Sequence, residues 1–480
     1  MNYLAFDLGA SSGRALLGVL DDDRLEITEL HRFANGPAPL PSGLHWNILG
    51  LWTEILHGLR AAASHHPVSL GLDAWGVDFG LLDAQDTLIG NPYHYRDRRT
   101  AGMMEEAFKR VPKEQIYART GIQFMELNTL YQLYAMVKRG APALDIAETL
   151  LFTPDLLNFW LTGRKVNEFT IATTSQAYSP QTGTWATDIL DALDIPSHIF
   201  GQIIPPGTVL GALRDDVSRT AGVTGLSVIA PAAHDTGSAV AAAPASNEHF
   251  AWLSSGTWSI LGAETRQPDL SEKALAFNFT NEGGVFDAWR LSKNISGLWF
   301  MQECQREWGI SYDELTHLAA QARPFLAVID VDAPIFFRPG DMPQKIRDYC
   351  IRTGQTAPQT EGEIARVILE SLALKYRFVL GQLDELTGVR HEPLHIIGGG
   401  VKNQLLNQFA ANAVGRPVVA GPVEATATGN ILLQAIAMGD LADLAEARAI
   451  VRRSFPPAIY QPRADESWDA AYAKLLTLTT

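Results

Sequence analysis

Residues 7–14 combine a carboxylate with small residues and hydroxyls, a combination suited to handling phosphate. They read Asp-Leu-Gly-Ala-Ser-Ser-Gly-Arg and lie between two apolar runs, so we expect a β-hairpin with a polar tip. Gly9 and Gly13 allow positive φ and close approach of a ligand, and the serines add hydroxyl and N–H groups that can surround an anion. Asp7 repels phosphate and is better suited to hold a hydrated Mg²⁺. The alternative is a plain hairpin with a flexible turn.

A second carboxylate follows an apolar run near the middle of the chain. Residues 227–233 read as a buried strand that leads into His234-Asp235-Thr236-Gly237-Ser238, and an alanine-rich helix continues to Ala243. Asp235 can accept a proton from a bound hydroxyl group at this junction. The alternative is that Asp235 simply caps the amino terminus of the helix.

Two glycine-containing turns in the second half add further candidates for ligand contact. Residues 251–262 repeat the opening pattern, with an apolar strand, a Ser-Ser-Gly-Thr tip and another strand. Gly398-Gly399-Gly400 follows a buried strand and precedes a helix from Asn403, so it offers flat backbone and a helix amino terminus to a ligand. The alternative for this run is a tight strand-to-helix connection.

The length of the chain predicts two domains. At 480 residues it exceeds the size at which one hydrophobic core keeps growing. Because the second hairpin repeats the first, we place the domains at 1–242 and 243–480, with the two hairpins facing one another. The helix after Asp235 is expected to act as the hinge.

The periodicity predicts a βββαβ start followed by a mainly helical insertion. Two polar segments, 168–175 and 181–185, are expected to be solvated loops. The expected strands are 2–7, 14–20, 25–33, 69–75, 285–293 and 393–397, and the expected helices are 47–64, those within 101–138, 154–161, 295–308, 363–386 and 424–438.

The overall charge and the apolar runs limit the partners. A formal charge of −15 disfavours nucleic acid and anionic membranes, and no apolar run approaches the roughly 20 residues needed to span a bilayer. The amino terminus lacks the basic flank of a signal peptide. We therefore expect a cytoplasmic protein, a monomer or weak homo-oligomer, with small-molecule ligands. Cys304 and Cys350 are expected to be ordinary thiols, and Trp46 and Trp258 core residues.

Four groups of residues together resemble the FGGY carbohydrate kinases, which have the actin-like ATPase fold. These groups are Asp7-x-Gly-x-x-x-x-Arg14, His234-Asp-Thr-Gly237, Ser255-Gly-Thr257 and Gly398-Gly-Gly400. Further stretches look like the rhamnulokinase branch of this family, and the resemblance spans nearly the whole chain. They are residues 73–79, 95–97, 121–124, 128–132, 281–284, 293–299 and 420–425. Each motif alone is unspecific, whereas the combination is specific.

This resemblance implies a two-domain α/β fold of the actin-like, ribonuclease H-like type with a deep interdomain cleft. It implies phosphorylation of L-rhamnulose at the 1-hydroxyl by ATP, with magnesium, in L-rhamnose degradation. Asp235 would be the catalytic base, and Asp7 would hold the metal through water. The ATP-binding residues would be Ala10, Ser11, Ser12, Gly13, Arg14, Thr257, Gln302 and Gly399, and the sugar-binding residues would be Gly76, His234, Asp235, Thr236 and Asn294.

Two other functions stay open from the sequence. In a sugar kinase a few pocket residues select the substrate by the stereochemistry of its hydroxyl groups. The sequence does not show the geometry of these residues, so the acceptor can also be another ketose, such as L-fuculose or D-xylulose. The chain can also be an actin-like assembly or a sugar sensor that binds ATP without transferring phosphate. The lack of a basic segment or of a DNA-binding helix-turn-helix argues against a DNA-binding sensor.

Overall fold

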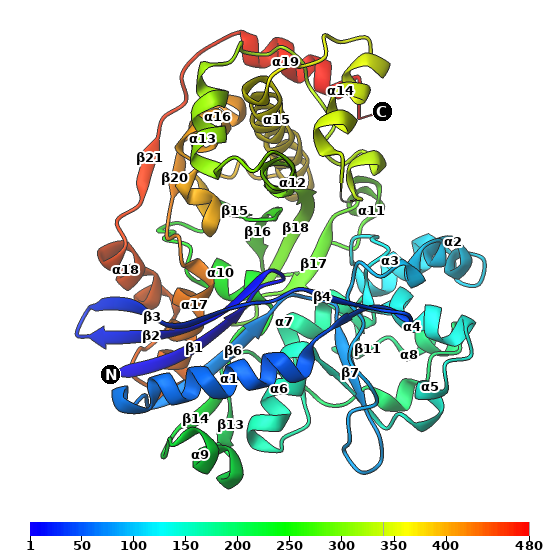
Figure 1. Cartoon of the computed structure of the whole chain (residues 1–480), viewed down its shortest axis with the longest axis vertical. Helices are drawn as coiled ribbons and strands as arrows, with labels where there is room; N and C mark the ends of the chain where they lie inside the picture. Colours follow the sequence, from blue (N-terminus) through cyan, green and yellow to red (C-terminus); the bar gives the residue numbers. More distant parts are fainter. Residues whose placement is uncertain (339, 480) are drawn as a thin grey trace. The chain divides into compact units, whose positions relative to one another are not determined.

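The computed structural model describes residues 1–338 and 340–479 and divides into two compact units (Figure 1). The first unit comprises Met1–Ala242, Glu264–Leu291 and Ala425–Ser454. The second unit comprises Ala243–Ala263, Ser292–Glu424 and Phe455–Thr480. Each unit is built around its own sheet.

The sheet of the first unit has the strand order β13-β14-β6-β1-β2-β3. Its opening hairpin pairs β1 antiparallel with β2, and β1 also pairs parallel with β6, which pairs parallel with β14. The predicted opening hairpin and third strand are therefore confirmed. The strand bounds are β1 Asn2–Leu8, β2 Ser12–Asp21, β3 Arg24–Ala34, β6 Ser69–Ala74, β13 Thr208–Ala212 and β14 Ser227–Ala230.

Helices cover both faces of this sheet, which explains why its central strands are apolar throughout. Helix α1, Ile48–Ala62, packs on the face that carries Phe6 and Ala15, where Gly58 leaves room for them. Helix α17, Ala425–Met438, packs on the opposite face at Gly18 and Gly71. Asn47 caps α1 as expected, because its side chain accepts a hydrogen bond from the Gly50 N–H.

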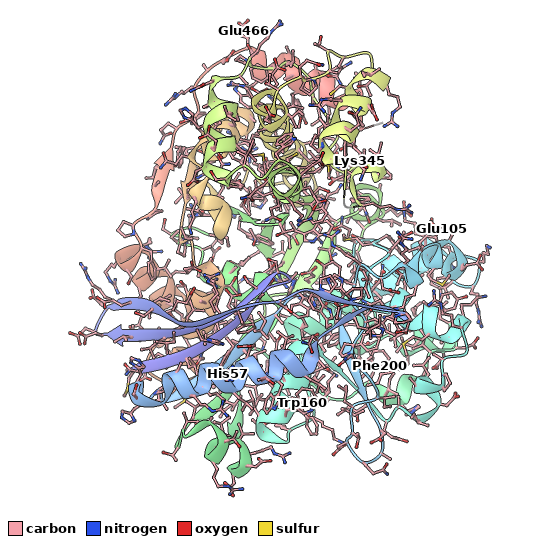
Figure 2. The ribbon with its side chains drawn as sticks, in the orientation of Figure 1. His57, Glu105, Trp160, Phe200, Lys345 and Glu466 are labelled. Carbon is pink, nitrogen blue, oxygen red and sulfur yellow. The ribbon has the colours of Figure 1, made fainter. Side chains whose placement is uncertain are left out.

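A long, largely helical segment separates β6 from β14. Its helix α6, Thr153–Thr162, lies against α1, where Trp160 packs edge-on against Trp52 with ring centroids 5.6 Å apart. Figure 2 labels Trp160 on α6 and His57 on α1. The other elements are β4 Pro37–Leu40, β5 Gly43–Trp46, β7 Phe79–Leu82, α2 Met103–Phe108, α3 Lys113–Thr120, α4 Thr129–Lys138, α5 Pro142–Ile146, β8 Thr149–Phe152, β9 Asn167–Glu168, α7 Phe169–Ala172, β10 Tyr178–Ser179, β11 Thr184–Trp185, α8 Thr187–Ala192, β12 Ile203–Ile204, α9 Asp215–Ala221 and α10 Asp235–Ala241.

The prediction of a solvated loop at 168–175 is wrong. Glu168, Thr170 and Ser175 are fully buried, and the segment forms β9, α7 and a short 3₁₀ turn. The polar side chains are tolerated there because backbone N–H groups and neighbouring side chains satisfy them.

The sheet of the second unit repeats the connectivity of the first. Strands β15 and β16 form an antiparallel hairpin with Ser255 opposite Ser259, and β15 pairs parallel with β19. The order β18-β16-β15-β19-β20 thus corresponds to β3-β2-β1-β6-β14. The predicted repeat of the opening hairpin is confirmed. The strand bounds are β15 Ala251–Ser255, β16 Trp258–Thr265, β18 Trp289–Ser296, β19 Leu394–Ile397, β20 Val418–Ala420 and β21 Ala458–Tyr460.

Two predicted boundaries in this region are wrong. Strand β18 runs past Asn294 to Ser296, and helix α12 begins only at Trp299 and ends at Trp308. Helix α15, Glu361–Thr387, starts with a capping box between Thr360 and Glu363 and agrees with the prediction. The remaining elements are α11 Glu272–Phe277, β17 Thr280–Gly283, α13 Tyr312–Gln321, α14 Met342–Arg352, α16 Gln404–Val414, α18 Leu444–Ser454 and α19 Ser467–Leu476. Among residues 1–338 and 340–479, no helix combines the length and apolar character needed to cross a membrane.

Candidate active site

Three neighbouring strands of the first unit carry acidic residues to one region of the sheet. Asp7 lies near the end of β1, in register with Asp73 on β6. The bridge between Ala74 and His234 then brings the start of α10, with Asp235, beside the end of β6. Carboxyl ends of parallel strands are common positions for ligand contact in α/β sheets.

The hairpin tip at residues 9–12 is held by its own backbone and by Asn35. The Gly9 N–H donates to the Ser12 carbonyl (2.9 Å), and the Asn35 side chain donates to the Gly9 carbonyl (2.8 Å). Neither Gly9 nor Gly13 has a positive φ, so the predicted use of that freedom is wrong. Gly13 is needed for space, because a Cβ there would lie 2.3 Å from the ring of Phe33.

Arg14 forms an ion pair with Asp7, its cross-strand neighbour. The Arg14 Nη2 atom lies 2.5 Å from Asp7 Oδ2, and both side chains are mostly buried. The Asp7 carboxylate therefore already has a guanidinium group as its partner. The pair ties the predicted metal ligand to the predicted phosphate-binding strand.

Asp73 is a fully buried acid that the sequence reasoning gave no role. Burial, and then the negative charge of Asp7, raise the pKa of Asp73 well above its usual value. Its Oδ2 accepts a hydrogen bond from Asn430 Nδ2 (2.5 Å), whereas its Oδ1 is buried without a hydrogen-bond partner among the described residues. Carboxylates near an unpaired buried oxygen are chemically suited to a hydrated dication.

Asp235 does not cap helix α10. The helix begins at Asp235 itself, the N-cap position belongs to His234, and no side chain caps this end. The capping alternative is therefore wrong. Asp235 Oδ1 accepts a hydrogen bond from Thr236 Oγ1 (3.0 Å), and about a third of its side chain, 32%, is exposed. The carboxylate is thus placed to meet a ligand.

A buried ion pair holds the ring of His234. Glu282 Oε2 lies 3.1 Å from Arg290 Nη2 and 3.1 Å from His234 Nδ1. Arg290 Nη2 also makes a hydrogen bond to His234 Nδ1 (3.1 Å). Glu282 and Arg290 thus both face Nδ1 and orient the ring, which leaves the other ring nitrogen, Nε2, on the side away from this pair. That atom lies 3.5 Å from Asp235 Oδ1.

Glu168 fixes the backbone that leads into His234. Its carboxylate accepts hydrogen bonds from the N–H groups of Thr170 and Ala233 (2.9 and 3.0 Å), and Thr170 Oγ1 accepts one from the His234 N–H (3.1 Å). Burial raises the pKa of Glu168 to about 7, although these hydrogen bonds oppose the shift. The segment predicted to be solvated therefore supports the backbone just before helix α10, where His234 and Asp235 lie.

Gly76 begins a strained turn after β6. Val77 has a φ of 67°, which is unfavourable for a β-branched residue, and Thr129 Oγ1 donates to its carbonyl (2.6 Å). Asp78 accepts hydrogen bonds from the indoles of Trp46 (2.6 Å) and Trp75 (3.0 Å), and burial raises its pKa to about 6. These contacts hold the turn rigid and confirm that Trp46 is a core residue.

In the second unit the predicted site residues Thr257 and Gln302 contact one another, and the glycine turn that includes Gly399 packs against the same hairpin. Thr257 Oγ1 donates to Gln302 Oε1 (3.2 Å) at the tip of the β15–β16 hairpin. A Cβ on Gly400 would lie 2.0 Å from Ser255 Oγ, so the glycine turn packs against the same hairpin, whereas a Cβ on Gly399 would meet nothing within 4 Å. Asn294 lies in β18, the neighbour of β16 in the sheet.

Family models match both halves of the chain. The N-terminal domain of the FGGY family of carbohydrate kinases matches residues 2–242, and its C-terminal domain matches residues 251–438. The chain belongs to this family. The expected family resemblance is therefore confirmed, and the protein is a carbohydrate kinase.

Two relatives of this carbohydrate kinase are similar over nearly their whole length. A rhamnulokinase from Bacteroides thetaiotaomicron is 45% identical over 98% of both chains. A rhamnulokinase from Bacillus subtilis is 38% identical over 96% of both chains.

Solved structures support the same fold. A ligand-bound xylulose kinase from Lactobacillus acidophilus matches with a TM-score of 0.81 at 17% identity, over 99% of this chain and 96% of that one. A Plasmodium falciparum glycerol kinase matches with a TM-score of 0.79 at 15% identity, over 100% of this chain and 96% of that one. The expected two-domain α/β, actin-like fold is thereby confirmed.

Sequence reasoning about this kinase missed several residues around His234 and Asp235. Glu282 belongs to the stretch 281–284, which contributed to the family resemblance but received no role. Arg290 lies in the expected strand 285–293, and Glu168 lies in the segment 168–175 that was expected to be a solvated loop. No local pattern marks these residues, because each acts through a partner distant in sequence. Charged residues in otherwise apolar surroundings are the one available signal.

Proposed function

We propose that this FGGY kinase transfers the γ-phosphoryl group of ATP to the 1-hydroxyl of L-rhamnulose, yielding L-rhamnulose 1-phosphate in L-rhamnose catabolism. The observation that carries the proposal is the 45% identity, over 98% of both chains, to a protein named rhamnulokinase. Other proteins of that name share 38–42% identity over at least 94% of this chain.

In this proposal Asp235 accepts the proton of the 1-hydroxyl as the oxygen bonds to phosphorus. A general base of this kind contributes on the order of 100- to 10,000-fold to the rate. His234 would contact the sugar through Nε2, because Arg290 and Glu282 occupy the Nδ1 side of the ring. Thr236, Gly76 and Asn294 complete the proposed sugar contacts.

The ATP phosphates are assigned to the two hairpin tips. Residues 10–14 of the first hairpin and Thr257 of the second supply N–H and hydroxyl donors to phosphoryl oxygens, and Gln302 and Gly399 serve the nucleotide. The open space beside Gly399 suits this assignment. Transfer requires the two hairpins to reach one nucleotide, which we assign to closure about the boundary near residue 242. Small-angle scattering that shows no compaction with sugar and a non-hydrolysable nucleotide would argue against that closure.

Mg²⁺ fits the acidic region of the first unit. Asp7, supported by the nearby Asp73 and Asp235, would hold the ion through water, and the ion would neutralise charge on the phosphates. Burial, and then the negative charge of Asp7, raise the pKa of Asp73, and such an ion would relieve the second of these two effects.

The test is an assay of ATP consumption with L-rhamnulose, L-fuculose and D-xylulose at saturating ATP. We expect the highest kcat/KM with L-rhamnulose, and Asp235→Asn should lower kcat by at least about 100-fold while ATP binding is kept. Asp188→Asn, at an exposed carboxylate, is the matched control. If L-fuculose or D-xylulose is preferred, that ketose is the acceptor in place of L-rhamnulose. Near-normal turnover by Asp235→Asn would show that Asp235 is not the general base. ATP binding without sugar-dependent ADP release would indicate a sensor or assembly protein instead.

A further inference from the structure

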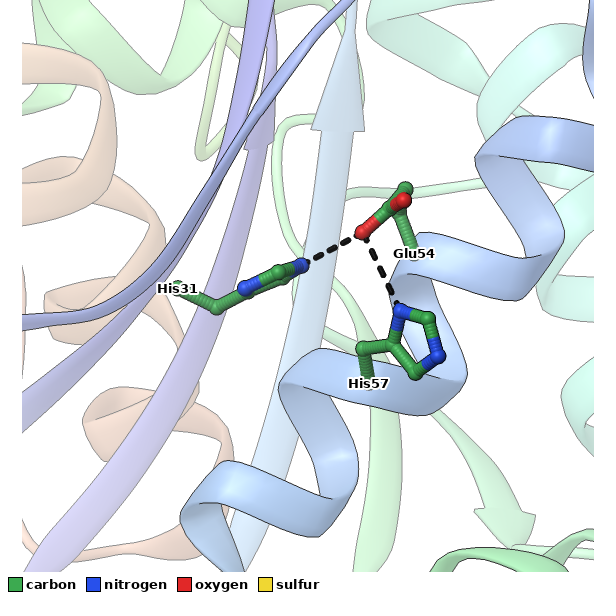
Figure 3. A group of neighbouring side chains, drawn as sticks. All are labelled: His31, Glu54 and His57. Carbon is green, nitrogen blue, oxygen red and sulfur yellow. Dashed lines mark hydrogen bonds and ion pairs between the residues drawn. The ribbon is translucent and has the colours of Figure 1, made fainter.

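A second cluster of ligand-type side chains lies on the first unit, separate from the residues assigned to transfer. His31 on β3 and Glu54 and His57 on α1 converge between the strand and the helix (Figure 3). We propose that these three side chains form a binding site for a divalent transition-metal ion of the zinc class.

The ligand atoms already share one centre. Glu54 Oε2 lies 2.6 Å from His31 Nε2 and 3.3 Å from His57 Nδ1, and all three atoms lie within 4.8 Å of one another. In a tetrahedral zinc site with bonds of about 2.0–2.1 Å, neighbouring ligand atoms are about 3.3 Å apart. The Glu54–His57 separation of 3.3 Å meets this value, whereas the Glu54–His31 separation of 2.6 Å has to lengthen when an ion binds.

The local backbone directs all three side chains to this centre. Glu54 and His57 are three residues apart on α1, so they lie on one face of the helix. On β3 the pairing with β2 shifts register between Glu29 and His31, which forms a bulge. Bulges re-aim side chains, and here the bulge precedes the histidine that points toward α1.

The chemistry of the ligands selects the kind of ion. Two imidazoles and one carboxylate suit zinc, cobalt or nickel, whereas magnesium prefers oxygen ligands alone. The side chains are 26%, 32% and 46% exposed for His31, Glu54 and His57, so an ion can enter and water can fill the fourth position.

The test is calorimetric titration of the untagged, EDTA-treated full chain with zinc chloride, followed by the visible spectrum with cobalt chloride. We expect one bound zinc per chain and a four-coordinate cobalt spectrum. Glu54→Gln and His57→Gln should each weaken zinc binding by roughly tenfold or more, and the same zinc concentration should raise their melting temperatures less than that of the wild type. Cys304 and Cys350 are buried and do not compete.

His65→Gln, at an exposed histidine just beyond α1, is the matched control and should bind zinc like the wild type. ATP consumption without zinc should be unchanged in all three variants, which separates this test from that of the proposed kinase function. The inference is overturned if no zinc binds, or if Glu54→Gln and His57→Gln bind zinc as tightly as His65→Gln.

Discussion

Removing one partner of the buried pair of Glu282 and Arg290 should strongly destabilise the first unit. The Glu282→Gln variant leaves the fully buried Arg290 without its carboxylate. Unit charges 3.1 Å apart interact by about 5 kcal/mol at an effective dielectric constant of about 20. Because the buried carboxylate also carries a desolvation cost, the expected loss is about 3–5 kcal/mol, the usual range for breaking a buried pair from one side.

This loss converts into a measurable change of melting temperature. The first unit contains about 300 residues, and an unfolding entropy of about 2.1 cal/mol/K per residue gives about 0.6 kcal/mol/K. Differential scanning calorimetry of Glu282→Gln should therefore show the transition of this unit lowered by about 5–8 °C. Glu29→Gln breaks the exposed pair with Arg32 and should lower it by less than about 2 °C.

A double variant tests the pairing itself. In Glu282→Leu/Arg290→Met both charges are gone. The loss of stability in this double variant should therefore be clearly smaller than the sum of the losses in Glu282→Leu alone and Arg290→Met alone. The reasoning is refuted if Glu282→Gln changes the melting temperature no more than Glu29→Gln does, or if the two single losses simply add.

Three further outcomes follow from the structure. Gly400→Ala should lower the melting temperature, because its Cβ would lie 2.0 Å from Ser255 Oγ. Gly399→Ala, where a Cβ meets nothing within 4 Å, should leave the melting temperature unchanged and raise the KM for ATP. Equal melting temperatures of the two variants would contradict this reasoning. Gly13→Ala should also destabilise the protein through its contact with Phe33, and Gly13→Ala/Phe33→Leu should recover part of the loss in the same scan. The pKa of Glu168 rises from 4.5 to about 7 on folding, so the folded state holds a proton that the unfolded chain releases, and stability should fall by about 3 kcal/mol between pH 4.5 and 7. Urea unfolding at pH 5 and pH 8 should show this loss of stability in the wild type but not in Glu168→Gln. If the free energy of unfolding changes equally with pH in both proteins, Glu168 is not the source of the change.

The sequence predicted the parts of the fold that depend on local pattern. The opening hairpin, its repeat at 251–262 and the long helix α15 follow from apolar periodicity, turn residues and a capping box. The end of β18 was missed because Asn294 is polar, yet strand pairing continues to Ser296. A polar residue alone does not end a strand.

The supports of the candidate site were beyond prediction for a different reason. Glu168 is buried because N–H groups of Ala233 and Thr170 solvate its carboxylate, and Ala233 is 65 residues away. Glu282 reaches His234 from another strand, again through contacts without a sequence period. Such residues look like ordinary surface charges until the chain is folded.

The two sheets share one strand order but carry connections of very different length. Residues 75–226 separate β6 from β14 in the first unit, whereas residues 398–417 separate the corresponding strands of the second. The longer connection contains the Gly76 turn and its supports at Thr129 and Thr174. A chimera that grafts residues 75–226 from a relative would therefore exchange the Gly76 turn together with its supports while both hairpins stay unchanged.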